Sequence, residues 1–307
     1  MSGSSVRGVV VGLDASADAQ LALDWAAAEA ALRDIPLRLV HAASLAPFQV
    51  ARVDRDTVAQ AAAKAAEELL GRAESRVREQ YGTLRVETKV LSEEAVPGLI
   101  RVSEHADLLV VGSRGLNQFT SVLIGSVSQA LVAHAPCPVV VFRADPRPAD
   151  GGPRSGGAAE ATAGADAVVV GVGYGKTHAP VAFAFAEAAR RAVPVVAIRG
   201  WEYPPDYFGG YAMLAPDDAE QRNQEEAAEL VEALAKARAA HPQVRVRQEV
   251  GLGNPATALV DASARACLVV LGVERHRRHL ALPVGAVAQR VLHHSHCPVA
   301  VVPHGHH

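Results

Sequence analysis

Strand-like and helix-like segments alternate along the first half of the chain. Five short runs are either apolar throughout or alternate apolar with polar residues, and both patterns predict β-strands. Runs without alternation are typical of parallel strands that are covered by helices on both faces. The predicted strands are Val6–Leu13, Leu37–His41, Leu84–Val90, Leu108–Val111 and Pro138–Phe142.

Four segments between these strands repeat apolar residues every three or four positions, which is the spacing of a helix that buries one face. A long helix is predicted over Thr57–Tyr81, and shorter ones over Glu93–Glu104 and Ser126–Ala135. The first helix of the chain presents an apolar stripe made of Leu21, Trp25, Ala28 and Leu32. The inward residues of the long helix are expected to be Val58, Ala62, Ala65, Leu69, Ala73 and Val77.

The second half of the chain repeats the first. The segment Asp107–Phe142 aligns without a gap onto Cys267–Val302 at an offset of 160 residues, which carries Cys137 onto Cys297. The chain also contains VVVGLDAS near its start and VVVGVGYG from Val168. A repeat of this length indicates a tandem duplication of one domain.

Each repeat follows the order β-α-β-α-β-α-β-α-β, which predicts an α/β fold. We expect two tandem doubly wound domains, each a five-stranded parallel sheet sandwiched by helices. Residues 144–166 are rich in Pro, Gly and Ala without an apolar period, a composition typical of a flexible linker. The predicted domains are therefore 1–143 and 167–307. Ligands of such sheets bind beyond the carboxyl ends of the strands, where the strand order reverses.

Composition narrows the class of protein. Half of the 307 residues are hydrophobic and 21% are charged, which supports a packed globular core. The net charge of −3 gives no reason to expect nucleic acid or an anionic membrane as a partner. No apolar run approaches the roughly 20 residues of a membrane helix, and the N-terminus lacks the features of a secretion signal. Three scattered cysteines are too few for a disulfide framework. We expect a cytoplasmic protein.

The stretch GSRGLNQFTSVLIGS, residues 112–126, places glycines at both ends of the connection between the fourth strand and the last helix. Gly112 and Gly115 permit φ > 0 and let backbone N–H groups approach an anion. Gly125 and Ser126 open the helix, where unbonded N–H groups and the positive dipole end favour phosphate. Ser126 can cap that helix or donate its hydroxyl to a phosphate oxygen. Arg114 adds a positive charge beside the connection.

A single Gly-x-x-Gly would equally fit an ordinary strand-to-helix turn with a serine N-cap. The complete spacing G-x-x-G-x9-G-S, together with Asp14 after the first strand, favours a nucleotide site instead. This combination resembles the universal stress protein family in its nucleotide-binding branch, and the resemblance covers both repeats. It implies that the first repeat binds an adenine nucleotide, ATP, accompanied by Mg²⁺.

The resemblance also implies which residues of the first repeat contact the nucleotide. Asp14 is expected beside the ribose and the metal on the phosphates, and the backbone at His41–Ala42 is expected to read the adenine edge. The alternative for Asp14 is a turn or N-cap role, and for His41 a partly buried side chain at a strand end. The family often has Gly-x-Pro where this chain has SEEAVPG, residues 92–98. The residues expected around the triphosphate are Gly112, Arg114, Gly115, Gly125, Ser126, Val127 and Ser128.

The second repeat differs at most of these positions. In place of Asp14, Gly115 and Ser126 it has Gly173, Arg275 and Ala286. It retains Gly272 and Gly285. An arginine obstructs close approach of the backbone to a phosphate, so we expect the second repeat to bind ATP weakly or not at all. Its basic loop ERHRRHL, residues 274–280, could bind another anion through side chains, although a solvated charge run is the simpler interpretation.

Two further features of the second repeat carry chemistry. Three roles fit the aromatic segment Trp201–Tyr211: a cover over the altered pocket, a surface that binds a partner, or a cluster packed beneath a long loop. Several histidines near the C-terminus, together with Cys297, resemble a set of metal ligands. Their spacing matches no tetrahedral template, and the alignment of Cys297 with Cys137 favours a packing role.

No catalytic set of residues is evident. Val127 follows Gly125-Ser126 where a P-loop has lysine, and the chain has no G-x-S-x-G elbow. We expect an ATP-binding regulatory protein rather than an enzyme, and a role in stress and growth arrest follows from the family resemblance alone. Slow Mg²⁺-dependent hydrolysis beside Asp14 is one alternative. A scaffold whose second domain recruits partners is another.

The family resemblance further implies pairing through the last strand of each domain. Two copies in one chain can make this pairing internally, Val139–Phe142 against Val299–Val302, which would cover both exposed strand edges. We predict an intramolecular pseudo-dimer and leave open a further homodimer. High Ala, Arg and Pro usage suggests a bacterium with a GC-rich genome.

Overall fold

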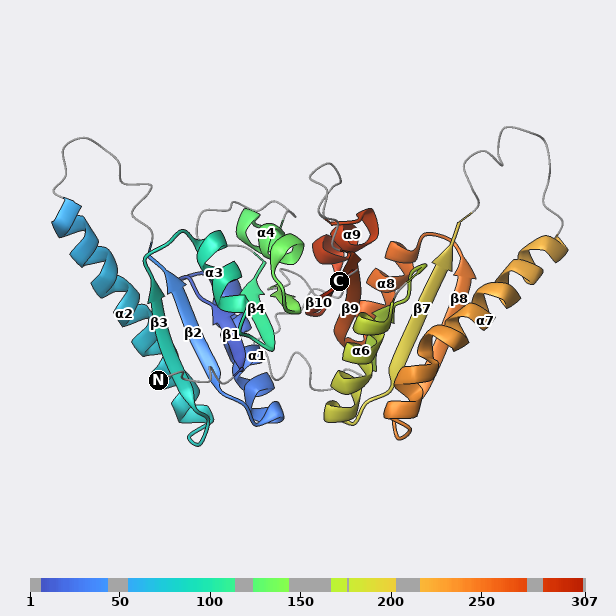
Figure 1. The fold of residues 1–307 in the computed structure, drawn as a ribbon, viewed down its shortest axis with the longest axis horizontal. Helices are drawn as coiled ribbons and strands as arrows, with labels where there is room; N and C mark the ends of the chain where they lie inside the picture. Colours follow the sequence, from blue (N-terminus) through green and yellow to red (C-terminus); the bar gives the residue numbers. More distant parts are fainter. Residues whose placement is uncertain are drawn as a thin grey trace, which may run out of the picture. The chain divides into compact units, whose positions relative to one another are not determined.

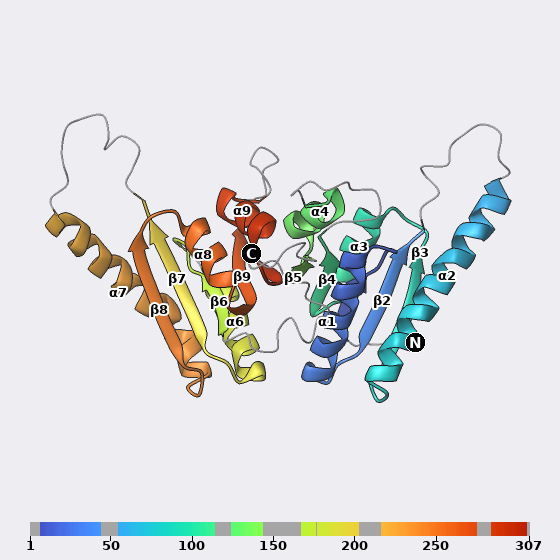
Figure 2. The ribbon, with the colours of Figure 1, turned by 180° about the vertical axis from the view of Figure 1, so that it is seen from behind.

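In the computed structural model the chain divides into two compact units, unit 1 (1–163) and unit 2 (164–307). The structure describes residues 7–43, 55–113, 124–143, 167–175, 177–202, 216–274 and 284–305. The predicted linker, 144–166, lies outside these ranges. Each unit is an α/β domain in which helices cover both faces of a sheet (Figure 1 and Figure 2).

Unit 1 has its five parallel strands in the order β3-β2-β1-β4-β5. Helices α1 and α2 pack on one face of the sheet, and α3 and α4 pack on the other. The order reverses between β1 and β4, so their carboxyl ends form the switch point at which such sheets bind ligands. The elements are β1 (Val9–Gly12), α1 (Ala17–Arg33), β2 (Leu37–Ala42), α2 (Arg55–Gln80), β3 (Val86–Leu91), α3 (Ala95–Ser103), β4 (Leu108–Gly112), α4 (Ser126–His134) and β5 (Val139–Phe142).

The predicted strands of the first repeat are all present, and the predicted α/β fold class is confirmed. Residues 9–11 and 108–110 are at most 1% exposed, because helices cover both faces of these central strands. In the edge strand β3 the successive residues Thr88 and Lys89 are both exposed, so burial does not follow the alternation of the sequence. That strand begins at Val86 rather than Leu84.

The predicted apolar stripe of α1 is wrong at Leu32, which is 44% exposed, although Trp25 is buried as expected. The buried face consists mainly of small residues, including Ala22, Ala26 and Ala30, none of which has any exposed surface. Small side chains let a helix lie close to the sheet, and here they form the buried face of α1. The spacing of the large apolar residues therefore did not identify that face correctly. The first half of α2 differs in the same way, since Ala65 is exposed.

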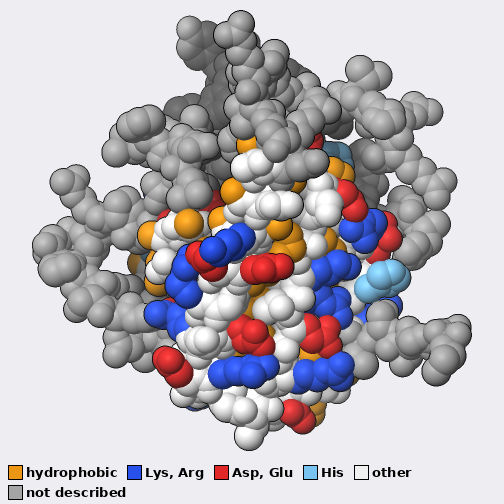
Figure 3. Space-filling model, turned by 90° about the vertical axis from the view of Figure 1, so that its left-hand side faces the viewer, with side chains coloured by type: hydrophobic (Ala, Val, Ile, Leu, Met, Phe, Trp, Pro, Cys, Tyr) orange, Lys and Arg blue, Asp and Glu red, His pale blue; other side chains and the backbone are white. Residues whose placement is uncertain are grey.

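The surface of unit 1 that includes α2 interleaves basic and acidic side chains (Figure 3). Several of these charges form exposed or half-exposed ion pairs, such as Arg78 with Glu74 and Arg85 with Glu87. Pairs of this kind contribute little to stability. This pattern is typical of a solvated surface.

Unit 2 follows the same plan, with its parallel strands in the order β8-β7-β6-β9-β10. Helix α6 has 14 residues where α1 has 17, and each ends at a residue of left-handed conformation, Ala192 and Asp34 respectively. Helix α6 therefore lacks the first turn of α1. The elements are β6 (Ala167–Gly171), α6 (His178–Arg191), β7 (Val195–Trp201), α7 (Pro216–Ala240), β8 (Val246–Leu252), α8 (Pro255–Ser263), β9 (Ala266–Glu274), α9 (Ala286–His294) and β10 (Val299–His304).

Candidate functional site

Gly112 ends β4 at the switch point of unit 1 and lies against the first turn of α1. A Cβ atom at this position would come within 2.9 Å of the Ala19 nitrogen and of the Asp18 carbonyl carbon. No described glycine of unit 1 has a positive φ. The prediction that Gly112 serves a left-handed backbone is therefore wrong. Glycine is needed here because the backbone of α1 passes so close to the end of β4.

Ser113 connects four elements of unit 1. Its N–H donates to the Phe142 carbonyl at 2.6 Å, and its carbonyl accepts the N–H of Gly125 at 2.7 Å. Its hydroxyl donates to Asp18 Oδ2 at 2.7 Å, and both side chains are buried. The sequence analysis missed both residues, although Ser113 lies within the G-S-R-G motif. Its partner, 95 residues away, depends on how α1 packs.

The first turn of α4 lies directly beyond this connection. Gly125 is the N-cap, with φ −64° and ψ 151°, and Ser126 is the first residue of the helix, exposed to solvent. The prediction that Ser126 caps α4 is therefore wrong. The first N–H groups of a helix have no intrahelical acceptor, which leaves those of Ser126, Val127 and Ser128 for a ligand. The Ser128 hydroxyl is buried and donates to the Gly112 carbonyl at 2.7 Å.

Asp14 follows β1 and faces the start of α1. Its Oδ1 accepts the Ser16 N–H at 2.9 Å and also the Ser16 hydroxyl. The Ser16 oxygen accepts the N–H of Ala19 at 3.2 Å, which makes Ser16 the N-cap of α1. Asp14 thus has a turn-stabilising role. It also stays half-buried at the switch point, where a ligand can reach it.

The end of β2 lies on the other side of β1. The His41 Nδ1 donates to the Leu13 carbonyl at 2.7 Å, and the Ala43 N–H donates to the Leu91 carbonyl at 2.9 Å. Ala42 is the last residue of β2, paired in register with Leu91. His41 therefore ties β2 to the segment that carries Asp14.

The structure brings most of the predicted site residues of unit 1 to one edge of the sheet. Hydrogen bonds link three of them: the Ser128 hydroxyl bonds to the Gly112 carbonyl, and the Gly125 N–H bonds to the carbonyl of Ser113, the residue after Gly112. Asp14 reaches the same region through the first turn of α1. Arg114 and Gly115 lie outside the described residues.

The corresponding edge of unit 2 holds a cavity of about 550 Å³. Gly285 is the N-cap of α9 and Ala286 its first residue, as at Gly125 and Ser126 in unit 1. A Cβ atom on Gly272 would meet the His304 ring at 2.8 Å and the Pro180 Cγ at 3.0 Å, not the backbone of a helix. The missing first turn of α6 accounts for this difference.

A buried ionic network flanks this cavity. Arg199, 3% exposed, donates to Glu226 at 2.5 Å and also to Glu229, and its guanidinium lies 4.6 Å from the centre of the Tyr174 ring. The Tyr174 hydroxyl donates to Glu226 at 3.1 Å. Burial acts to raise the pKa of Glu226, but the hydrogen bonds from Arg199 and Tyr174 lower it below its ordinary value. Glu226 is therefore ionised at neutral pH and balances the charge of Arg199.

The remaining features of unit 2 are only partly described. Trp201 is buried and its Nε1 donates to the Asn223 side chain at 2.7 Å, whereas 203–211 lie outside the described residues. Of the basic loop only Glu274 is described. Burial raises the pKa of Cys297 to about 12, so this thiol stays protonated. The described part of the chain contains no group of three His, Cys, Asp or Glu side chains that could hold a metal ion.

Residues 6–143 and 164–303 each match the model of one family, described as the universal stress protein family. The chain belongs to the universal stress protein family. The resemblance stated from the sequence is thereby confirmed, with two such domains in tandem.

Two mycobacterial universal stress proteins are similar over nearly their whole length. The protein Rv2623 of Mycobacterium tuberculosis is 33% identical over 318 residues, covering 98% of this chain and 97% of that protein. A relative from Mycolicibacterium smegmatis is 31% identical over 306 residues, covering 96% of each. A solved universal stress protein from Archaeoglobus fulgidus has a TM-score of 0.65 at 18% identity, covering 96% of this chain and 98% of its own. That likeness shows a shared fold.

The described helices include none with an apolar stretch long enough to span a bilayer.

Proposed function

We propose that unit 1 binds ATP, with Mg²⁺ on its phosphates, and that the protein acts as an ATP-binding regulator. The observation that carries this proposal is the pair of main-chain bonds made by Ser113. They join the ends of β4 and β5 to the N-terminus of α4, beside the switch point between β1 and β4. Anions bind well at such a helix N-terminus, and nucleotides bind at such a switch point.

The phosphates are expected at the first turn of α4. The N–H groups of Ser126, Val127 and Ser128 supply donors, and the exposed Ser126 hydroxyl supplies another. The first turn of α4 contains no acidic side chain that would repel a phosphate. Gly115 and Arg114 join this set by family resemblance.

The rest of the nucleotide is expected across β1. The backbone at Ala42 would contact the adenine edge, and Asp14 would contact the ribose or a metal-bound water. A carboxylate offers about four lone-pair sites, so the two bonds from Ser16 leave capacity on Asp14. Mg²⁺ is usually held by one or two carboxylates and phosphate oxygens, which suits a site with one carboxylate. When bound, Mg²⁺ would neutralise phosphate charge.

The same geometry favours binding over catalysis. Ser113 and Asp18 form a hydrogen-bonded pair, but both are buried, and no described histidine lies between them. His41 is held by the Leu13 carbonyl. A nucleophile needs a base within reach, so we expect negligible ATP turnover. Turnover that collapses in Asp14→Ala would support the alternative of a slow ATPase.

A matched pair of variants tests the proposal in the full chain. Gly125→Glu puts a carboxylate at the N-cap of α4, where it suits the helix dipole but repels a phosphate. Gly285→Glu makes the same substitution in unit 2, where the glycine is exposed and not buried as Gly125 is, so circular dichroism of both variants must first show that they fold. In calorimetric titrations with Mg-ATP we expect Gly125→Glu to abolish binding and Gly285→Glu to leave it unchanged. Equal binding of Mg-ATP by both variants, or no binding by the unaltered chain, would contradict the proposal and favour the scaffold alternative.

The regulatory role of ATP binding is proposed in the same way as the binding itself. A role in stress and growth arrest rests on the family, and pairing of the two last strands within one chain stays a prediction.

A further inference from the structure

Unit 2 has two cysteines that stand opposite each other on neighbouring strands. Cys267 is the second residue of β9, and Cys297 lies two residues before β10. The register of these strands pairs Val299 with Val269, an offset of 30 residues that also separates Cys297 from Cys267. The Val269 N–H donates to the Pro298 carbonyl at 3.0 Å, so the strands are already hydrogen-bonded before the first residue of β10.

The two thiols lie close together at the amino ends of the strands. Cys267 is 4% exposed, and its Sγ donates to the Ala167 carbonyl at 3.3 Å. Cys297 is half-buried, and its Sγ lies 3.7 Å from the Ser295 Oγ. Burial raises the pKa of Cys297 to about 12, and the proximity of the Cys267 thiol adds to the increase. Both cysteines are thiols in this structure.

The spacing of the two cysteines suits a disulfide. Neighbouring strands lie about 4.7–4.9 Å apart, and the two Cα atoms of a disulfide are usually about 4.4–6.8 Å apart. The strands therefore need not separate or slide for the bond to form. The Cys267 side chain must turn from the Ala167 carbonyl of β6, on one side of β9, toward β10 on the other.

Unit 1 lacks this pair. Cys137 takes the place of Cys297 in the aligned repeats, but Asp107 takes the place of Cys267. The chain has three cysteines in all, so unit 1 cannot form an equivalent bond. The comparison supplies a cysteine of the same position without a partner of the same kind.

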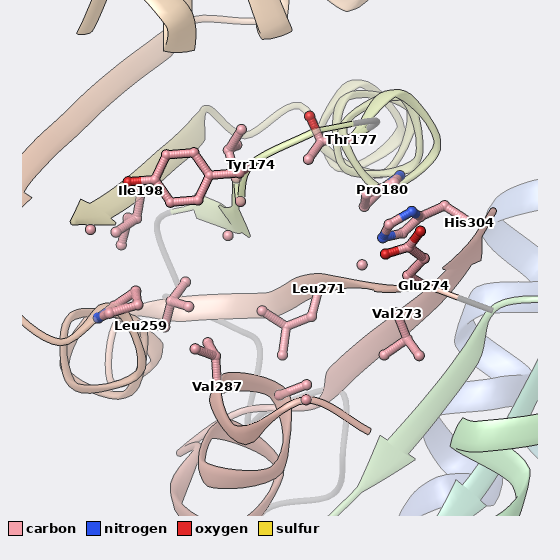
Figure 4. A pocket seen from close by; sticks show the side chains of 18 of the residues that line it. Tyr174, Thr177, Pro180, Ile198, Leu259, Leu271, Val273, Glu274, Val287 and His304 are labelled. Atoms are coloured by element: carbon pink, nitrogen blue, oxygen red, sulfur yellow. The ribbon is translucent and has the colours of Figure 1, made fainter. Parts of the chain in front are cut away.

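The cysteine pair lies at the opposite end of the sheet from the unit 2 cavity. Residues that line the cavity, such as Leu271 and Val273, come from the carboxyl-terminal half of β9 (Figure 4). Cys267 is at the start of the same strand. The inference below is therefore independent of the function proposed for unit 1 and of any ligand in this cavity.

We propose that Cys267 and Cys297 form a reversible disulfide when the protein is exposed to a hydroperoxide. Hydrogen peroxide transfers one oxygen atom to one of the thiols, which becomes a sulfenic acid, and the rest of the peroxide leaves as water. The second thiol attacks the sulfenic sulfur, the S–S bond forms, and a second water leaves. Two electrons pass from the two sulfurs to the peroxide. A dithiol reductant restores both thiols by exchange.

The reaction is expected to be slow at neutral pH. The thiolate is the reacting form of cysteine, and burial keeps Cys297 protonated. The bond should therefore form over hours rather than seconds in dilute peroxide. Such a pair stays reduced in a reducing compartment and responds to sustained oxidation rather than to a brief exposure.

Peptide mapping of the unaltered full-length chain tests the bond directly. Trypsin cleaves after Lys and Arg, which places Cys137, Cys267 and Cys297 on separate peptides: 115–143, 266–275 and a third that starts at residue 291. The folded chain is treated with hydrogen peroxide, its remaining thiols are blocked with iodoacetamide in denaturant, and the peptides are analysed by mass spectrometry without reduction. We expect peptide 266–275 to be joined to the third peptide, and dithiothreitol to separate them.

The stability of unit 2 provides a second measurement. The bond closes a loop of about 30 residues, which restricts the unfolded chain and stabilises the folded one. In a Trp25→Phe background, where Trp201 reports on unit 2, peroxide should raise the urea midpoint by about 1 M or more. Dithiothreitol should reverse the rise. Cys267→Ala should abolish it, and the unit 1 control Cys137→Ala should keep it.

Several results would overturn the proposal. Cys267 and Cys297 could both remain open to iodoacetamide after prolonged oxidation, or be oxidised to sulfinic acids without a bond between them. A bond to Cys137 or to a second chain, or a bond that forms only in urea, would contradict the pairing within folded unit 2. So would a rise in the urea midpoint that persists in Cys267→Ala. The mapping uses the unaltered chain, so it remains decisive even where a variant fails to fold.

Discussion

Units 1 and 2 share one fold and differ where their strands end. In unit 1 the first turn of α1 lies against Gly112 and supplies Asp18 to Ser113. In unit 2 that turn is missing, and an apolar cavity occupies the same edge. A short change at the start of one helix thus alters which groups meet at this edge of the sheet. Function in such folds depends on these terminal residues rather than on the sheet.

A second contrast lies at the end of the second strand of each unit. The N–H of Leu13 donates to Val40, and that of Val172 donates to Ile198, so His41 and Arg199 occupy the same position in the two units. His41 makes one hydrogen bond to a carbonyl, whereas Arg199 is buried in an ionic network. Substitutions at the two positions should therefore lower the free energy of unfolding by very different amounts.

The largest effect is therefore expected from Arg199→Met. Removing one partner of a buried ion pair leaves an uncompensated charge and costs about 3–5 kcal/mol. His41→Leu should cost unit 1 only about 0.5–1.5 kcal/mol, the value of one hydrogen bond. The chain has one tryptophan in each unit, Trp25 and Trp201, which allows the units to be followed separately.

Urea unfolding followed by fluorescence would measure both losses. A Trp25→Phe background reports on unit 2, and a Trp201→Phe background reports on unit 1. Similar losses in the two units would contradict the contrast between a single bond and a buried network.

A smaller difference is expected between Gly112→Ala and Gly272→Ala. The new methyl group on Gly112 would meet helix backbone, which cannot move without shifting α1, and overpacking of this kind costs about 1–3 kcal/mol. On Gly272 it would meet the His304 ring and Pro180, and the ring can turn away. We expect Gly112→Ala to destabilise unit 1 and to weaken its binding of ATP. Gly272→Ala should destabilise unit 2 by less. The same single-tryptophan unfolding experiment decides, and an equal or reversed order would refute the close-approach explanation.

The smallest effect concerns pH and unit 2. Burial lowers the pKa of His304 below its ordinary value of 6.5, so the folded state binds a proton less readily than the unfolded chain. Its contribution to stability is therefore present above the unfolded pKa and is lost as pH falls toward the folded value. His304→Gln should reduce the loss of unit 2 stability between about pH 7.5 and about pH 5.5. His296→Gln, at an exposed position, serves as the control, and an unchanged acid sensitivity in His304→Gln would contradict the prediction.

The sequence was sufficient for the features that depend on local patterns. Continuous apolar runs predicted the strands because both faces of each sheet are covered. The spacing of glycines from Gly112 to Ser126 correctly predicted where β4 ends and where α4 begins. The offset of the repeat predicted a second domain of the same plan.

Features that depend on packing could not be predicted in this way. Small alanines formed the buried face of α1, so Leu32 was assigned to the wrong side. The reason for glycine at position 112 became clear only when α1 was placed against β4. Ser113 and Asp18 meet across 95 residues of sequence, and no local pattern joins them. The unit 2 cavity likewise depends on a missing helical turn.

The most direct test of the account counts the nucleotide that unit 1 retains. Purified full-length protein is saturated with Mg-ATP, separated from unbound nucleotide and denatured, and the released nucleotide is counted per chain by chromatography. We predict about one ATP per chain, lost in Gly125→Glu and kept in Gly285→Glu. Two per chain would contradict the difference between the units, and none would contradict nucleotide binding by unit 1.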